Sequence, residues 1–189
     1  FPGFSIQKRS IRQYEYSYAA HVLGDVAEVS QANIDEDDYY QPGDYIGKSG
    51  IEKSYEKYLR GEKGMQIMLR DARGRIQGKY HNGALDRKPI AGKDLTLSID
   101  LNLQALGERL LEGKKGAIVA IEPSTGEVLA MVSAPTYDPR MLVGRNRGKV
   151  HRMLSRDNWT PLLNRAIMGQ YPPGSTFKTS QGLTFLTEG

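Results

Sequence analysis

The chain has 189 residues, a net charge of +4 at pH 7 and 39% hydrophobic residues. This length is enough for one large domain or two small ones, and no apolar run approaches the ~20 residues that span a bilayer. The absence of cysteine excludes disulfides and thiolate metal sites. The N-terminal Phe1-Pro2-Gly3 lacks the basic stretch and apolar core of a signal peptide, so we expect soluble material as the chain stands.

The first third of the chain predicts an arm, two helices and a loop between them. Residues 12–18 are rich in alternating aromatic residues, which suits a strand or an extended arm. Residues 19–24 suit a short helix closed by glycine, and residues 31–47 are rich in turn formers and predict a loop. Ser49 is placed as the N-cap of a helix over residues 50–60.

Charge is distributed unevenly along the chain. Residues 35–44 carry five acids and no basic residue, whereas residues 60–93 carry nine Lys or Arg against three acids. Within residues 64–81, polar and apolar residues alternate around a turn at 71–74, which predicts a hairpin. A solvated face or a protein-docking surface therefore explains the basic stretch better than a nucleic-acid site, and we expect no nucleic-acid partner.

A change of composition marks a boundary near the middle of the chain. Residues 82–92 are polar and interrupted by glycine and proline, so we place a domain boundary there. Residues 95–99 predict a strand, and Asp100 is placed as the N-cap of an amphipathic helix over residues 101–112.

The second half predicts a further hairpin and then less regular structure. Residues 116–121 and 128–132 are apolar on successive positions, which indicates two strands whose sheet is covered on both faces. Residues 134–150 read as a loop. The three histidines, at positions 21, 81 and 151, are too far apart in sequence to indicate a metal site, and each reads as structural or exposed.

The most informative motif is Ser175-Thr176-Phe177-Lys178, preceded by Pro172-Pro173-Gly174. Serine and lysine three apart on a helix share one face, and the Pro-Pro-Gly segment suits a rigid, tight turn before that helix. Ser175 is therefore predicted at a helix N-terminus, where free N–H groups favour negative charge. A nucleophilic serine needs such donors and a base, which Lys178 would supply.

The spacing alone is a weak signal, because roughly one Ser-x-x-Lys is expected by chance in a chain of this length. The chain contains three. The one at Ser5 has no glycine or proline beside the serine and no clear helical pattern, and the one at Ser54 lies on a charged, solvated helix face. Only Ser175 combines the spacing with a turn-forming approach and an apolar continuation.

Several stretches together resemble class B penicillin-binding proteins of the elongation type. They follow the family's order across nearly the whole chain. The matching residues are Ala20 to Gly24, Gly47 to Lys53, Tyr58 to Gly61, Leu97 to Asp100 with Gln104, Gly126 to Ser133, Pro161 to Ala166 and Tyr171 to Lys178.

The resemblance implies an α+β fold in two parts. Residues 1–92 would form the non-catalytic head, or pedestal, built from strands and short helices. Residues 93–189 would form the first part of the penicillin-binding transpeptidase domain, an antiparallel sheet with helices. Ser175 would be the nucleophile of a peptidoglycan D,D-transpeptidase, and Lys178 would take its proton. No cofactor and no metal are implied.

The same resemblance implies partners and a location. Peptidoglycan stem peptides and β-lactam antibiotics would react at Ser175, and a SEDS-family glycosyltransferase and elongation scaffold proteins would contact the head. The acidic residues 35–44 and the basic residues 60–93 are candidate contact segments. The protein would work on the periplasmic side of the inner membrane, anchored by an upstream helix that is not in this chain.

The chain departs from the family after Lys178. The family's Ser-x-Asn and Lys-Thr-Gly motifs are not found in residues 179–189. We therefore expect a truncated transpeptidase domain that is inactive by itself, with residues beyond about 135 disordered or covered by another copy of the chain. Two alternatives stay open: a non-catalytic docking module for cell-wall elongation, and a serine β-lactamase or β-lactam sensor.

Overall fold

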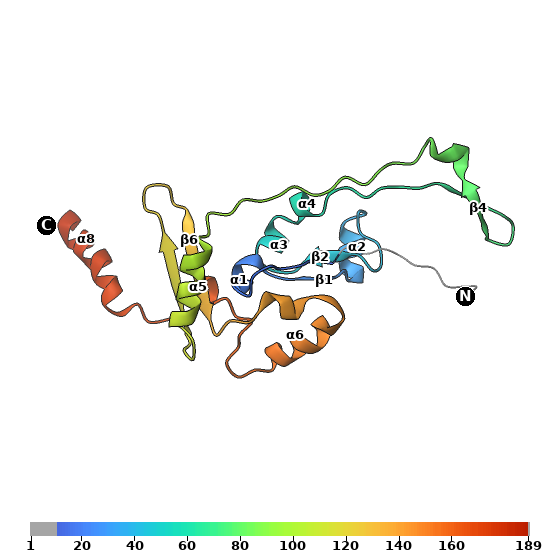
Figure 1. The fold of residues 1–189 in the computed structure, drawn as a ribbon. Coiled ribbons are helices and arrows are strands. Elements are labelled where there is room, and N and C mark those ends of the chain that lie inside the picture. The colour runs from blue at the N-terminus through green and yellow to red at the C-terminus, as the bar shows by residue number, and fades with distance from the viewer. Residues whose placement is uncertain (1–10, 189) are drawn as a thin grey trace.

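The computed structural model describes residues 11–188, so the Ser5 motif lies outside the described residues. The fold is α+β, as predicted, with three separate two-stranded antiparallel sheets in the described part. The molecule is elongated: an arm carrying β4 extends to one end, α8 projects at the other, and the remaining elements lie between them (Figure 1).

The N-terminal elements are short. They are α1 (Ala20–Leu23), β1 (Val26–Glu28), α2 (Gln31–Glu36), β2 (Tyr45–Gly47), α3 (Gly50–Ser54) and α4 (Glu56–Leu59). The short helix over 19–24 is confirmed, and Gly24 ends it with a φ of 83°. Gly24 and Gly50 are in such close contact that a Cβ on Gly50 would lie 2.7 Å from the Gly24 nitrogen, so no side chain fits there.

Two predictions in this region are wrong. Residues 31–47 are not all loop: α2 forms because Ser30 and Asn33 make a reciprocal capping box, and β2 pairs with β1. The single helix over 50–60 breaks at Tyr55 into α3 and α4. Ser49 occupies the N-cap but makes no capping bond, because its Oγ donates to Asp25 instead, at 2.7 Å.

The basic segment forms the arm. Strands β3 (Met68–Arg70) and β4 (Ile76–Lys79) make the predicted hairpin, followed by the 3-10 turn η1 (Tyr80–Gly83). The chain then returns alongside its outgoing path, with isolated bridges joining Glu62 to Ile90 and Met65 to Arg87. The polar residues 82–92 thus have backbone partners within the arm.

The C-terminal half begins with α5 (Leu101–Leu110), which packs on the hairpin of β5 (Gly116–Ile121) and β6 (Val128–Ala134). Asp100 caps α5 as predicted, accepting from the backbone N–H groups of Asn102 and Leu103. The strand expected over 95–99 is absent. Instead that segment touches the outer edge of β6 through Ser98 Oγ and the Asp100 N–H.

One face of the β5–β6 sheet is covered only in part, which contradicts the prediction of two covered faces. Ala130, Val132 and Ala134 of β6 are buried, but Val119 and Ile121 of β5 are 46% and 56% exposed. Successive side chains of a strand point to opposite faces. On the second face α7 (Arg165–Met168) contacts β5 and β6, but Val119 and Ile121 remain exposed.

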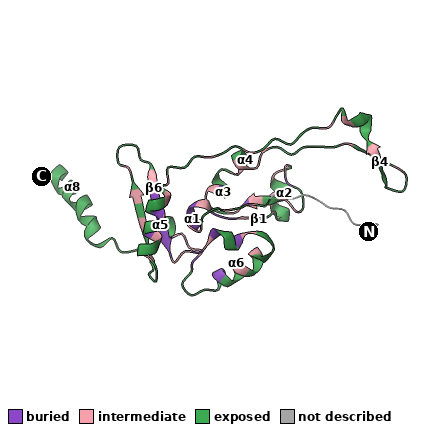
Figure 2. Ribbon diagram, in the orientation of Figure 1, coloured by how far each residue is buried: buried purple, intermediate pink, exposed green. Residues whose placement is uncertain are grey.

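The segment after β6 contains η2 (Pro139–Leu142), η3 (Gly144–Asn146) and α6 (Arg147–Ser155), so the loop predicted over 134–150 is wrong. Ala20 of α1 packs there with Tyr137, Leu142 and Leu154 in the apolar core. The expectation that residues beyond about 135 are disordered or covered by another copy of the chain is therefore wrong as far as α7 (Arg165–Met168), because this part packs within the same chain. Beyond α7, every residue from 170 to 188 is exposed, including all of α8 (Lys178–Glu188; Figure 2).

Candidate active site

Ser175 lies in a 3-10 turn, η4 (Gly174–Phe177), and not at the N-terminus of the α-helix as predicted. Gly174 has a φ of 56°, a left-handed conformation that glycine adopts without strain. The Pro172-Pro173 pair leads into this turn, and α8 begins at Lys178. The turn-forming approach is therefore confirmed, whereas the α-helix starts three residues later than the motif suggested.

Ser175 and Lys178 are neighbours through the backbone, since the Lys178 N–H donates to the Ser175 carbonyl. Among the described residues no hydrogen bond joins the Ser175 hydroxyl to the Lys178 amine, and both side chains are exposed. A lysine takes a proton from serine only where burial or nearby cations favour its neutral form. No described residue covers Lys178, so the pair is aligned in sequence but not assembled as a catalytic site.

The last buried residue before Ser175 is Arg165, at the start of α7. Its backbone N–H donates to Ser133 Oγ of β6 at 2.8 Å. Its guanidinium donates to the carbonyls of Trp159 and Thr160 at 2.8 and 3.0 Å, and to Thr160 Oγ1 at 2.6 Å. A buried guanidinium with these carbonyl partners fixes the loop that precedes α7.

Two further donors bind the same loop. His21 Nε2 lies 2.7 Å from the Pro161 carbonyl oxygen, and Ser133 Oγ donates to the Leu163 carbonyl at 2.9 Å. Because a carbonyl only accepts, Nε2 carries the proton in the neutral imidazole. Thr160 lies between these contacts with a φ of 49°, which is unusual for a β-branched residue.

The N-terminal helix α1 therefore packs against elements of the C-terminal half. The Ala19 N–H donates to Glu108 Oε1 of α5 at 2.7 Å, and Asp25 forms an ion pair with Arg147 of α6. His21 is buried and meets Tyr137 edge to face, with ring centroids 5.3 Å apart. Burial, with a smaller contribution from the Arg165 charge, lowers the pKa of His21, and burial raises the pKa of Tyr137 to about 12.

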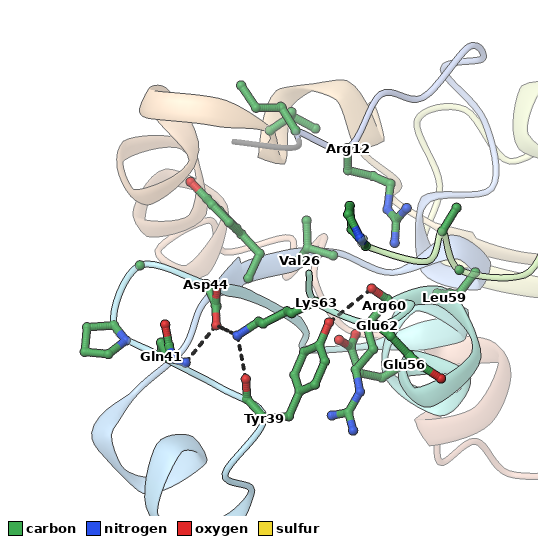
Figure 3. A pocket seen from close by; sticks show the side chains of 18 of the residues that line it. Arg12, Val26, Tyr39, Gln41, Asp44, Glu56, Leu59, Arg60, Glu62 and Lys63 are labelled. Atoms are coloured by element: carbon green, nitrogen blue, oxygen red, sulfur yellow. Dashed lines mark hydrogen bonds and ion pairs between the residues drawn. The ribbon is translucent and has the colours of Figure 1, made fainter. Parts of the chain in front are cut away.

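A separate pocket of about 760 Å³ lies beside the β1–β2 pair (Figure 3). Its cations already have partners. Lys63 bonds to the Tyr39 carbonyl and to Asp44, and Arg60, which pairs with Asp37 at 2.7 Å, lies 4.0 Å from the centre of the Tyr39 ring. None of the lining residues belongs to the Ser175 motif.

Over residues 11–188 no group of side chains is arranged to hold a metal ion.

The sequence analysis did not identify Arg165 and His21 as the side chains that bind the loop before α7. Both lie in stretches that carried the family resemblance, but neither was assigned a role. One local signal for Arg165 was available, a single cation inside the apolar run from Pro161 to Ile167. Nothing near His21 in the sequence points to Pro161, which is 140 residues away.

Comparison with known proteins gives a consistent result. Residues 1–97 match the family model of the penicillin-binding protein dimerisation domain, and residues 116–189 match that of the penicillin-binding protein transpeptidase domain. The peptidoglycan D,D-transpeptidase MrdA of Acinetobacter baumannii is 40% identical over 186 residues, which cover 97% of this chain and 27% of that protein.

Two solved structures are also similar. Pseudomonas aeruginosa PBP2, in complex with WCK 5153, is 39% identical with a TM-score of 0.76, and the match covers 95% of this chain and 36% of that one. Helicobacter pylori PBP2, in complex with MreC, is 35% identical with a TM-score of 0.79, over 94% of this chain and 33% of that one. The chain thus spans about a third or less of the length of the relatives that it matches.

Proposed function

The chain belongs to the penicillin-binding proteins, in which it combines a dimerisation domain with part of a transpeptidase domain, and we propose that it is part of an elongation-type peptidoglycan D,D-transpeptidase. The observation that carries this proposal is the position of Ser175 and Lys178 inside the segment that matches the transpeptidase model. We assign residues 1–92 to the head and residues 93–189 to the transpeptidase part.

In the proposed reaction the Ser175 hydroxyl oxygen attacks the penultimate D-alanyl carbonyl of a stem peptide. Lys178 accepts the hydroxyl proton and passes it to the leaving amine, so that terminal D-alanine departs and an acyl-enzyme forms. An amine of a second stem peptide then displaces Ser175 and completes the cross-link. A β-lactam acylates the same oxygen because its strained amide imitates the D-alanyl substrate.

This reaction needs a Lys178 environment that favours the neutral amine. In the described residues Lys178 is exposed. We therefore propose that the chain by itself is inactive and that the reaction belongs to the longer protein.

We also propose partners and a location, which the relatives support. The Helicobacter pylori relative is in complex with MreC, and a further structural neighbour, 34% identical, belongs to a peptidoglycan synthase complex. We propose a scaffold protein and a SEDS-family glycosyltransferase as partners of the head, and the periplasmic face of the inner membrane as the location. Within residues 11–188 no helix is long and apolar enough to cross a membrane.

The test is mass spectrometry of the longer protein after incubation with a penicillin. We expect a covalent adduct on the peptide that contains Ser175, absent in Ser175→Ala and retained in Ser180→Ala, a matched change in α8. An unlabelled wild-type protein that is folded, or an adduct that persists in Ser175→Ala, would refute the proposal.

A further inference from the structure

The segment that carries Ser175 has few attachments to the body of the molecule. Every residue from 170 to 188 is exposed, so packing does not place this segment. Its position depends on α7, which contacts β5 and β6 and begins at the buried Arg165. The 159–163 loop, immediately before α7, is in turn bound by side chains from other elements.

We infer that His21 is a positioning residue for acylation of Ser175, acting through its hydrogen bond to the Pro161 carbonyl. Within the described residues, His21 is the head side chain that bonds to this loop. The contact is fully enclosed, because His21 is 9% exposed and Arg165 6%. In such a site an unpaired carbonyl is costly, so the bond is expected to hold the loop in one arrangement.

The loop needs this support because its conformation is strained. Thr160 has a positive φ, a strained conformation for a threonine that persists only where the surrounding contacts enforce it. Arg165 binds the carbonyls of Trp159 and Thr160 on one side of this residue, and His21 binds Pro161 on the other. Without the His21 bond, Pro161 loses this partner, and only the Arg165 and Ser133 bonds oppose relaxation of the strained loop before α7.

This arrangement links the head to the reacting serine. His21 is held by α1, whose neighbouring Ala19 N–H is bound to Glu108 of α5. A change in the position of α1 therefore reaches Pro161 and the start of α7 through these bonds, and the chain then leads from α7 through residues 169–173 to the η4 turn. His21 itself does not touch the substrate, so its effect is on the placement of Ser175 and not on the chemistry of acyl transfer.

The inference rests on the proposed function and is tested in the longer protein with a fluorescent penicillin. The rate constant of Ser175 acylation is compared among wild type, His21→Leu and His21→Gln, with His81→Leu as the exposed control. Leucine fills the site without donating, whereas the glutamine amide can donate to Pro161. We expect a loss on the order of tenfold for His21→Leu, substantial recovery in His21→Gln, and no change for His81→Leu.

Hydrogen exchange at amides 163–169, measured well below the melting temperature of each variant, supplies a readout that is independent of activity. We expect faster exchange there in His21→Leu than in His21→Gln. Equal acylation rates in wild type and His21→Leu, or equal losses in the leucine and glutamine variants, would overturn the positioning role. Failure of the proposed function is distinguishable, because the wild-type protein itself would then remain unlabelled at Ser175.

Discussion

At the scale of single residues, the structure separates the reacting side chains from those that organise their surroundings. Ser175 and Lys178 are exposed, and no described side chain binds either one. Arg165, His21 and Ser133, in contrast, are buried and donate to the carbonyls of one short loop. Buried polar side chains are costly unless they are paired, so removal of one of these three is expected to destabilise the loop that they bind.

His21 leads to a prediction about pH. Its pKa is lowered in the folded chain, chiefly by burial and also by the Arg165 charge, whereas in the unfolded chain it lies near the ordinary value of ~6.5. The unfolded state therefore binds the proton first. The contribution of neutral His21 to stability is complete above about pH 6.5 and is lost as the pH falls toward the folded-state pKa.

Urea unfolding of wild type and His21→Gln at pH 7.5 and pH 5.5 measures this effect. We expect the free energy of unfolding to decrease more in wild type than in the variant. The difference isolates His21 from the other groups around the site, namely Arg165, Tyr137 and the Asp25–Arg147 ion pair. A wild-type protein that loses no more stability than His21→Gln would contradict the prediction.

At the scale of elements, the contact of α5 with β6 depends on a glycine. Gly107 is buried in the helix, and a Cβ there would lie 2.7 Å from Val132 Cγ2, closer than carbon atoms approach. Val132 is fully buried and has no room to move aside. Gly107 therefore permits a close approach that the hydrophobic pattern of α5 does not reveal.

Gly107→Ala is expected to destabilise the chain in spite of the better helix propensity of alanine. The propensity gain is about 1 kcal/mol, whereas overpacking of a core costs about 1–3 kcal/mol, so we expect a net loss of ~1 kcal/mol in thermal or denaturant unfolding. Gly148→Ala in α6, where nothing lies within 4 Å of the added Cβ, is the matched control and should be neutral or stabilising. Equal effects at the two sites would mean that the α5–β6 contact does not limit stability.

At the scale of the whole molecule, α8 and the β5–β6 hairpin lie together at the end opposite to the arm (Figure 1). Phe185 and Leu186 of α8 are 75% and 83% exposed, and Val119 and Ile121 of β5 are about half exposed. Unpartnered apolar surface of this kind favours association. We expect the isolated chain to self-associate with increasing concentration in sedimentation velocity experiments.

Replacing Phe185 and Leu186 together by serine should weaken this association, because both contribute large apolar area. Leu85→Ser, at an exposed position on the arm, serves as the control and should leave it unchanged. A wild-type chain that stays monomeric at all concentrations would contradict the prediction.

Elements whose signals are local could be predicted from the sequence alone. The short helix before Gly24, the β3–β4 and β5–β6 hairpins and the Asp100 cap of α5 all follow from turn residues, periodicity and capping, which act over a few residues. The family resemblance and the choice of Ser175 also came from short motifs. The local signal failed for α2 and α6, where polar composition resembled a loop but capping and packing produced helices.

The contacts that join the two halves could be learned only from the folded molecule. Ala20 shares a core with Leu142 and Leu154, and His21 meets Pro161, although these partners lie more than a hundred residues apart in the chain. Such contacts are set by which surfaces exclude water together and by which buried carbonyls find donors. The sequence around one partner does not reveal either condition. The bonds that hold the loop before the Ser175 segment could therefore be identified only in the folded molecule.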